Sequence, residues 1–254
     1  DASVAPDRLI RTKLVEDVLT LAAGAESPLQ RASLAERLAP HGMSFALVSA
    51  GTAGAARLLH PAAERLGAFR WNVEDTEGET AQRVVEALGK TPPAAVPNIA
   101  RVEFAGRVLL EHVLPQIKPD VALLWLSEPD VSFHWGGLRA EHTQRALKSA
   151  DAVLGQIMTW RDAQPDAQEI AIIVLSDHGH VTGRGKKCLR SELQRVGFRA
   201  GTGMAPDVDI VVAPAAAPGL WLRDPSLASQ VADFLATQNW AGPLLARDPA
   251  ILSP

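Results

Sequence analysis

Two runs of apolar residues stand out along the chain, because acidic and histidine side chains follow each of them closely. The first is Val121-Ala-Leu-Leu-Trp-Leu126 and the second is Ile170-Ala-Ile-Ile-Val-Leu175. Short apolar runs of this kind are typical of buried strands. Between them, residues 138–161 carry apolar side chains at helical spacing, which predicts a long amphipathic helix. The order strand, helix, strand predicts a βαβ crossover, and therefore a parallel sheet with right-handed connections.

The rest of the chain shows the same alternation of apolar runs and helical patterns. Helices are predicted over residues 29–38, 80–88, 104–117 and 227–240, and a further strand over 208–213. We therefore predict an α/β fold with a mainly parallel central sheet and helices on both faces, with strands near 45–49, 121–126 and 170–176. Since no internal repeat and no low-complexity linker interrupts the pattern, a single α/β domain over 1–254 is the simplest account.

Composition narrows the class of protein. The hydrophobic content of 47% predicts a soluble protein with a substantial core, and the net charge of −4 without a basic block predicts no nucleic-acid-binding surface. No apolar run reaches the roughly 20 residues that span a bilayer. Cys188 is the single cysteine, which excludes a disulfide within the chain. The compartment stays open, with an exported protein, periplasmic or secreted, favoured.

Both ends of the sequence suggest that the domain continues beyond them. The chain begins at Asp1 without an initiator methionine, and it ends at Pro254 without a capping signal. We therefore expect the α/β domain to be truncated at both ends.

The residues that follow the two apolar runs are suited to binding metal. Asp130 and His134 follow the first run and are spaced four apart, while Asp177 and His178 follow the second. Ligands in open α/β sheets collect at the carboxyl ends of parallel strands, so the two pairs are expected to meet. Carboxylate and imidazole are common zinc ligands. The pattern predicts two halves of one metal centre; the alternative for either pair alone is ordinary hydrogen bonding at the start of a loop.

Other polar residues near these motifs have weaker assignments. His180 lies close to the second pair and is a candidate outer partner of the ligands, while Arg184, Lys186 and Lys187 either meet a substrate phosphate or form a solvated loop. The remaining histidines, at positions 41, 60, 112 and 142, are expected to be solvated or to cap helices.

A catalytic nucleophile is not identifiable in the chain. Ser49 and Thr52 carry hydroxyl groups near a predicted strand end, yet no neighbouring acid or base in the sequence marks either of them as activated.

These motifs together resemble a known superfamily. The series Glu-Pro-Asp-x3-His, then Gly136-Gly137, then a long helix containing Asp151 and Gly155, then a strand and Ser-Asp-His-Gly is similar to the alkaline phosphatase superfamily. Its type I phosphodiesterase/nucleotide pyrophosphatase branch is the closest resemblance. The diagnostic stretch covers about 121–180, and the surrounding order of strands and helices agrees from about 30 to 240.

The resemblance implies an alkaline phosphatase-like fold and a two-metal centre. By matching position, Asp130 and His134 would bind one ion, and Asp177 and His178 the other. Zinc is the metal the family implies, with manganese as the alternative. The family also uses an upstream Asp, a Thr or Ser nucleophile and a further His, none of which can be placed in this chain. With two ligands per ion, we expect weak metal binding and no turnover by this segment alone.

The implied activity is hydrolysis of phosphodiester or pyrophosphate bonds in a small phosphorylated substrate such as a nucleotide. A related phosphonoacetate hydrolase or phosphomutase shares the same Asp/His framework and stays open as an alternative. A non-catalytic pseudoenzyme or binding protein on the same fold is the alternative from another class. The natural substrate and the oligomeric state are not determined by the sequence.

Overall fold

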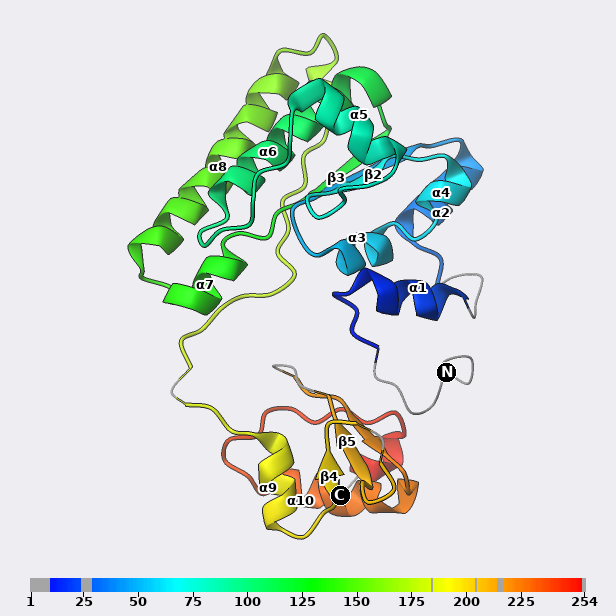
Figure 1. The fold of residues 1–254 in the computed structure, drawn as a ribbon, viewed down its shortest axis with the longest axis vertical. Helices are drawn as coiled ribbons and strands as arrows, with labels where there is room; N and C mark the ends of the chain where they lie inside the picture. Colours follow the sequence, from blue (N-terminus) through cyan, green and yellow to red (C-terminus); the bar gives the residue numbers. More distant parts are fainter. Residues whose placement is uncertain (1–9, 24–28, 184, 204, 214–216, 253–254) are drawn as a thin grey trace. The chain divides into compact units, whose positions relative to one another are not determined.

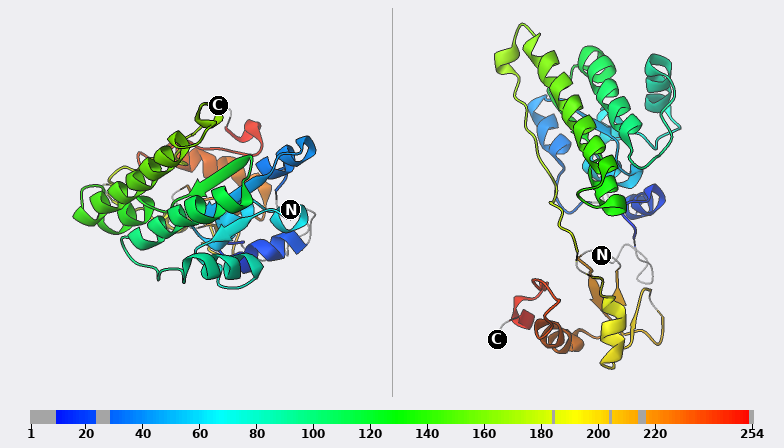
Figure 2. Two further views of the ribbon diagram at one scale, coloured as in Figure 1. Left: turned by 90° about the horizontal axis from the view of Figure 1, so that it is seen from above. Right: turned by 90° about the vertical axis from the view of Figure 1, so that its left-hand side faces the viewer.

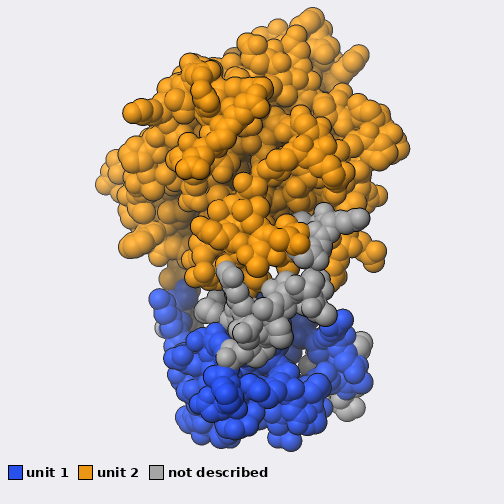
Figure 3. Space-filling model, turned by 45° about the vertical axis from the view of Figure 1, so that its right-hand side comes forward, with its two compact units in different colours: residues 1–9, 183–254 blue, residues 10–182 orange. Residues whose placement is uncertain are grey.

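The computed structural model describes residues 10–23, 29–183, 185–203, 205–213 and 217–252. The chain divides into two compact units, one of residues 10–182 and one of residues 183–254 together with 1–9 (Figure 3). The single domain over 1–254 stays a prediction. Within the described ranges, no helix combines the length and the apolar character that crossing a membrane requires.

The larger unit contains the predicted α/β core (Figure 1). Its strands are β1 (Phe45–Ser49), β2 (Arg70–Asn72) and β3 (Val121–Trp125). Its α-helices are α1 (Val15–Ala23), α2 (Leu34–Leu38), α3 (Ala53–Leu59), α4 (Ala63–Leu66), α5 (Glu79–Leu88), α6 (Ile99–Arg107), α7 (Asp130–Gly136) and α8 (Glu141–Asp162). Two 3-10 turns, η1 (Ala39–His41) and η3 (Ala167–Glu169), and a π-helical stretch, η2 (Val108–Ile117), complete it.

The three strands form one parallel sheet in the order β2-β1-β3. The register of β1 on β3 runs from Phe45 opposite Val121 to Ser49 opposite Trp125, so both strands end at the same edge. The predicted strands at 45–49 and 121–126 are therefore confirmed as parallel neighbours. This shared edge is the one from which the chain leaves β3 toward the first Asp/His motif.

Helices cover both faces of this sheet, as predicted. Side chains alternate along a strand, and β1 is fully buried on both sides. Ala46 and Val48 pack with residues of α5, α6 and η2, while Phe45 and Leu47 pack with residues of α2 and α3. A strand covered on both faces is the expected product of a continuous apolar run in a parallel sheet.

A close contact joins two helices on one face of the sheet. A Cβ added at Gly106 of α6 would lie 2.9 Å from Cγ1 of Val153 on α8, so glycine allows the helices to approach closely. Figure 2 shows the two helices side by side. The predicted helix over 138–161 is confirmed as α8, and the helix over 80–88 as α5.

The strand predicted at 170–176 is wrong. This segment has no regular secondary structure, and Ile173, Val174 and Leu175 expose 79%, 67% and 86% of their surface. A strand needs a partner edge, and β-propensity mostly measures packing on a pleated surface. The apolar composition of this segment predicts that it can form a strand, but it does not show whether a neighbouring strand is available to pair with it. The βαβ crossover is consequently present only as its first strand, β3, and its helix, α8.

Pro115 accounts for a second difference from the sequence pattern. The predicted helix over 104–117 spans the end of α6 and all of η2, where the hydrogen bonding changes to the π-helical type. Pro115 lies inside η2 and has no N–H to donate to the regular ladder.

The smaller unit has its own sheet and core. It contains β4 (Ala200–Gly201), β5 (Ile210–Val212), β6 (Leu220–Leu222), α9 (Leu189–Arg195), α10 (Ala228–Ala236) and the 3-10 turns η4 (Pro225–Leu227) and η5 (Pro249–Leu252). Strand β5 pairs parallel with β4 and antiparallel with β6. The core includes Leu193 of α9, Ile210 of β5 and Val231 of α10. The helix predicted over 227–240 is observed as the shorter α10, and the strand predicted over 208–213 as β5.

Candidate metal centre

Helix α7 presents the first Asp/His pair. Asp130 is the first residue of this helix and His134 is four residues later, so both lie on one face. Their Oδ1 and Nε2 atoms are 3.4 Å apart. The helix ends before Gly137, whose φ of +79° favours glycine. The buried hydroxyl of Thr143 donates to the Gly137 carbonyl at 2.9 Å, which ties the end of α7 to α8.

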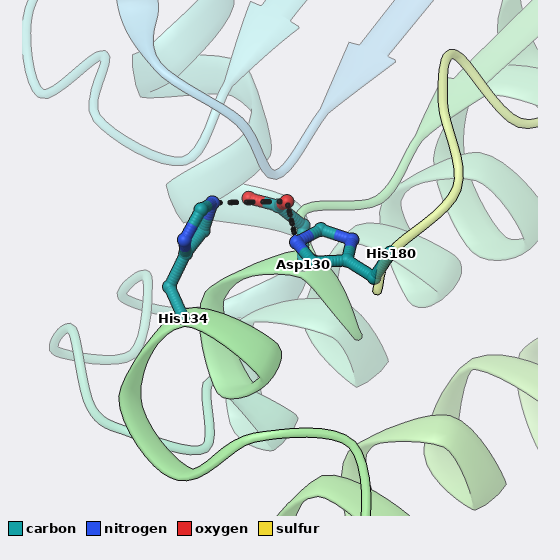
Figure 4. Close-up of side chains that lie close together, drawn as sticks. All are labelled: Asp130, His134 and His180. Carbon is teal, nitrogen blue, oxygen red and sulfur yellow. Dashed lines mark ion pairs between the residues drawn. The ribbon is translucent and has the colours of Figure 1, made fainter. Parts of the chain in front are cut away.

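His180 completes a group of three with this pair. Its Nε2 lies 3.3 Å from Oδ1 of Asp130, and the ligand atoms of Asp130, His134 and His180 all lie within 4.8 Å of one another. Figure 4 shows the Asp130 carboxylate between the two imidazole rings. His180 comes from the coil that follows the exposed apolar segment, and its side chain is the least exposed of the three, at 17%.

The spacing of these atoms suits a tetrahedral metal ion. Two ligand atoms that each lie 2.0–2.2 Å from a tetrahedral ion are separated by about 3.4 Å. The two observed separations from Oδ1 of Asp130, 3.4 Å to His134 and 3.3 Å to His180, match this value. One carboxylate oxygen and two imidazole nitrogens are also the donor set that zinc prefers. The ligand atoms of the three residues therefore lie close enough together to hold a divalent ion such as zinc.

The key oxygen of this group has no other partner. Oδ1 of Asp130 is shielded from solvent and accepts no hydrogen bond from the residues that the structure describes. A buried polar atom without a partner costs free energy and calls for an explanation, such as a bound ion. Three imidazole nitrogens face this oxygen, because Nε2 of His178 also lies 3.8 Å from it. An ion between these groups would satisfy all of them.

The second predicted pair lies beside this group. Oδ2 of Asp177 and Nε2 of His178 are 3.5 Å apart, again close to the separation of two ligands on one ion. The other carboxylate oxygen of Asp177 accepts the backbone N–H of His178 at 3.0 Å. The rings of His178 and His180 have centroids 5.2 Å apart. The structure thus brings Asp130, His134 and His178 close together, with Asp177 at the side of His178, and their role as metal ligands stays a prediction.

His180 lies closer to Asp130 than its assignment as an outer partner implied. In an extended segment, residues two apart project from the same side of the backbone. The spacing His178-x-His180 could therefore have indicated that both imidazoles face one site. The ring of His180 also packs on Phe133 of α7, with centroids 4.8 Å apart.

The remaining candidates are not assembled into this centre. Ser49 is fully buried, and its Oγ accepts hydrogen bonds from Asn72 Nδ2 and the Gly51 N–H, so it is held as a structural group. Thr52 caps the start of α3, where its Oγ1 accepts the N–H of Ala55. Neither arrangement marks an activated nucleophile.

Lys186 and Lys187, the basic candidates that the structure describes, belong to the smaller unit. Lys187 pairs with Glu192 at 3.4 Å, which favours the solvated-loop interpretation for this residue. Lys186 is exposed in the same coil, and Arg184 lies outside the described residues.

The site is thus a carboxylate–imidazole cluster at the end of a parallel strand in an α/β protein, which is the arrangement of a metal-dependent enzyme class. A family model described as type I phosphodiesterase/nucleotide pyrophosphatase matches residues 61–219. Because this match covers more than half of the chain, the protein belongs to the type I phosphodiesterase/nucleotide pyrophosphatase family. The match confirms the resemblance, and the α/β architecture agrees with an alkaline phosphatase-like fold. No curated protein and no solved structure matches the chain.

Proposed function

We propose that this protein is a metal-dependent hydrolase of phosphodiester or pyrophosphate bonds, with a nucleotide or another small phosphodiester as its substrate. The family supports the reaction class. The observation that carries the proposal is the convergence of His134, His178 and His180 on one carboxylate oxygen of Asp130, at separations of 3.4, 3.8 and 3.3 Å.

The two Asp/His pairs support a proposal of two metal positions. Asp130, His134 and His180 would hold one divalent ion, while Asp177 and His178 would contribute to a second. His180 raises the first set to three protein ligands, the number that catalytic zinc sites use beside an open position. The sequence alone predicted two ligands for each ion. Zinc suits the donor set best, with manganese as the alternative.

The bound ions would polarise the phosphoryl oxygens as Lewis acids, and they would activate and orient the attacking oxygen. The role of the protein is to fix the geometry around them. Helix α7 holds Asp130 and His134 on one face, and the coil brings His178 and His180 to the same place. The side chains of Asp130, His134 and His178 are about half exposed or more, so a substrate phosphate could reach the ligands from solvent.

The test is zinc-dependent hydrolysis of bis(p-nitrophenyl) phosphate by the full-length protein and by its Asp130→Asn variant. Asp151→Asn is the matched control, because Asp151 is exposed on α8 away from the three-residue group. Hydrolysis that is lost in Asp130→Asn and kept in Asp151→Asn supports the proposal. The Asp177→Asn and His178→Ala variants should also lose hydrolysis while keeping the fold.

Other outcomes would identify the alternatives. Hydrolysis of phosphonoacetate, or phosphate transfer within a sugar phosphate, in place of diester hydrolysis would favour the related phosphonoacetate hydrolase or phosphomutase. Metal binding with none of these activities would favour a binding protein on this fold. An exported location stays a prediction.

A further inference from the structure

A buried carboxylate lies directly before the metal-centre helix. Glu128 is 4% exposed, and both of its oxygens accept backbone hydrogen bonds. Oε1 accepts the N–H of Asn98 at 2.6 Å, and Oε2 accepts the N–H of Ser132 at 3.0 Å. Charge-assisted bonds of this kind are stronger than neutral ones, and they explain how the carboxylate is tolerated inside the protein.

The two donors belong to different helices. Asn98 is the residue that precedes α6, and Ser132 is in the first turn of α7, where backbone N–H groups have no partner within the helix. Glu128 therefore joins the start of α7 to the start of α6. Helix α6 is itself held firmly, because Gly106 packs closely against Val153 of α8.

We propose that Glu128 is a positioning residue of the metal centre, which sets the orientation of α7 and through it the places of Asp130 and His134. The inference rests on the proposed function, because it assumes that the three-residue group binds metal. Helix α7 has only seven residues, with Asp130 at its first position and His134 four later. A small rotation of this helix would move both ligands relative to His180, which comes from a separate segment.

Metal binding is sensitive to such a rotation. Ligand distances are productive only within about 0.2 Å of their ideal values. Groups that orient ligands from outside the coordination sphere typically change metal affinity by about 10- to 100-fold when they are replaced. The two hydrogen bonds of Glu128 come from the backbone N–H groups of Asn98 and Ser132 and not from a candidate ligand side chain, so its effect passes through the backbone of α7.

Glutamine cannot replace this carboxylate. Both oxygens of Glu128 face N–H donors, whereas a glutamine side chain has one oxygen acceptor and one NH₂ donor. In Glu128→Gln, one of the two backbone N–H groups would face another donor, and the link between α6 and α7 would be lost on that side. Glu128→Asp keeps both acceptors but withdraws them by one methylene, so it should retain part of the link.

The experiment is isothermal titration calorimetry with zinc chloride. It is carried out on the native 254-residue chain and on its Glu128→Gln and Glu128→Asp variants. Glu103→Gln is the matched control, because Glu103 is exposed on α6. Zinc affinity should fall by about 10- to 100-fold in Glu128→Gln, by less in Glu128→Asp, and not in Glu103→Gln. Far-UV circular dichroism establishes that each variant is folded.

Cobalt(II) absorption is the second measurement, because it reports coordination geometry and a purely structural role would leave it unchanged. Folded Glu128→Gln should give an altered cobalt spectrum. If Glu128→Gln does not fold, Glu128→Asp decides the question with the same two measurements. If the folded variants keep the native zinc affinity and the native cobalt spectrum, the positioning role of Glu128 is overturned, while the proposed function is not affected. A native chain that binds neither zinc nor manganese would overturn the proposed function, and the positioning role with it.

Discussion

Nε2 of His180 lies 3.3 Å from Oδ1 of Asp130, although the two residues belong to different kinds of backbone structure. Asp130 begins a helix that directly follows the parallel sheet, while His180 belongs to a coil segment. The contact therefore joins a residue on a regular element to one on irregular backbone. A metal ion at this place would hold the coil against α7, and its affinity would then depend on His180 as well as on the helix.

His180→Ala is expected to reduce zinc affinity by about 100-fold or more. Removing a direct ligand should cost at least as much as removing a group that only orients ligands, which is about 10- to 100-fold. The measurement is calorimetric zinc titration of the chain. His41→Ala is the control, because His41 is exposed at the end of η1 and belongs to no metal group among the described residues. Equal affinity in the two variants would remove His180 from the centre.

The exposed apolar segment gives a prediction about stability. Leu175 is 86% exposed, whereas Leu47 of β1 is fully buried between the two helical layers. Leu47→Ala should lower the free energy of unfolding by about 2–5 kcal/mol, because it leaves a cavity. Leu175→Ala should change it by about 0.5 kcal/mol or less. Urea unfolding measures both, and a loss in Leu175→Ala as large as that in Leu47→Ala would mean that residues 170–176 are packed as a strand after all.

His60 gives a prediction about pH. Its side chain is fully buried at the end of α3, with its ring edge-on to Phe45. Burial, with the nearby positive charge of Arg70, lowers the pKa of His60 to about 4 from its ordinary value of 6.5. The unfolded chain therefore takes up this proton at a higher pH than the folded chain. The contribution of neutral His60 is fully present above about pH 6.5 and is lost as the pH falls toward 4.

The size of this effect is about 3 kcal/mol between pH 7 and pH 4. His60→Leu should make the free energy of unfolding less dependent on pH over this interval, because it removes the group that protonates on unfolding. Urea unfolding at several pH values measures the slope. His41→Leu, at an exposed position, should keep the native slope. A native slope in His60→Leu would show that other groups cause the acid sensitivity.

The sequence predicted those parts of the fold in which a local pattern and its packing agree. The run Phe45–Ser49 is apolar on both sides and lies between two helical layers, so its composition described its surroundings correctly. The run 170–175 has a similar composition but pairs with no strand in the described structure. Apolar composition shows that a segment can be buried, but it does not identify the strand or helix against which the segment packs.

The arrangement of the candidate site was predictable only where its residues lie on a regular element. Asp130 and His134 were found because their spacing places them on one helical face. The sequence did not predict the contact of His180 with Asp130, because this contact depends on the course of an irregular segment. Glu128 stood in the Glu-Pro-Asp motif, but the sequence did not indicate its hydrogen bonds, since its partners are backbone N–H groups that no side-chain pattern records. One of them belongs to Asn98, 30 residues away in the sequence.

The central claim is that Asp130, His134 and His180 bind one metal ion. Anomalous X-ray diffraction at the zinc absorption edge, from crystals grown with zinc, tests it most directly. The account predicts an anomalous peak about 2.0–2.2 Å from a carboxylate oxygen of Asp130 and from Nε2 of both histidines. The peak should be absent from crystals of Asp130→Asn. Well-ordered crystals with these three side chains in place and no peak between them, or with the zinc bound elsewhere, would contradict the claim.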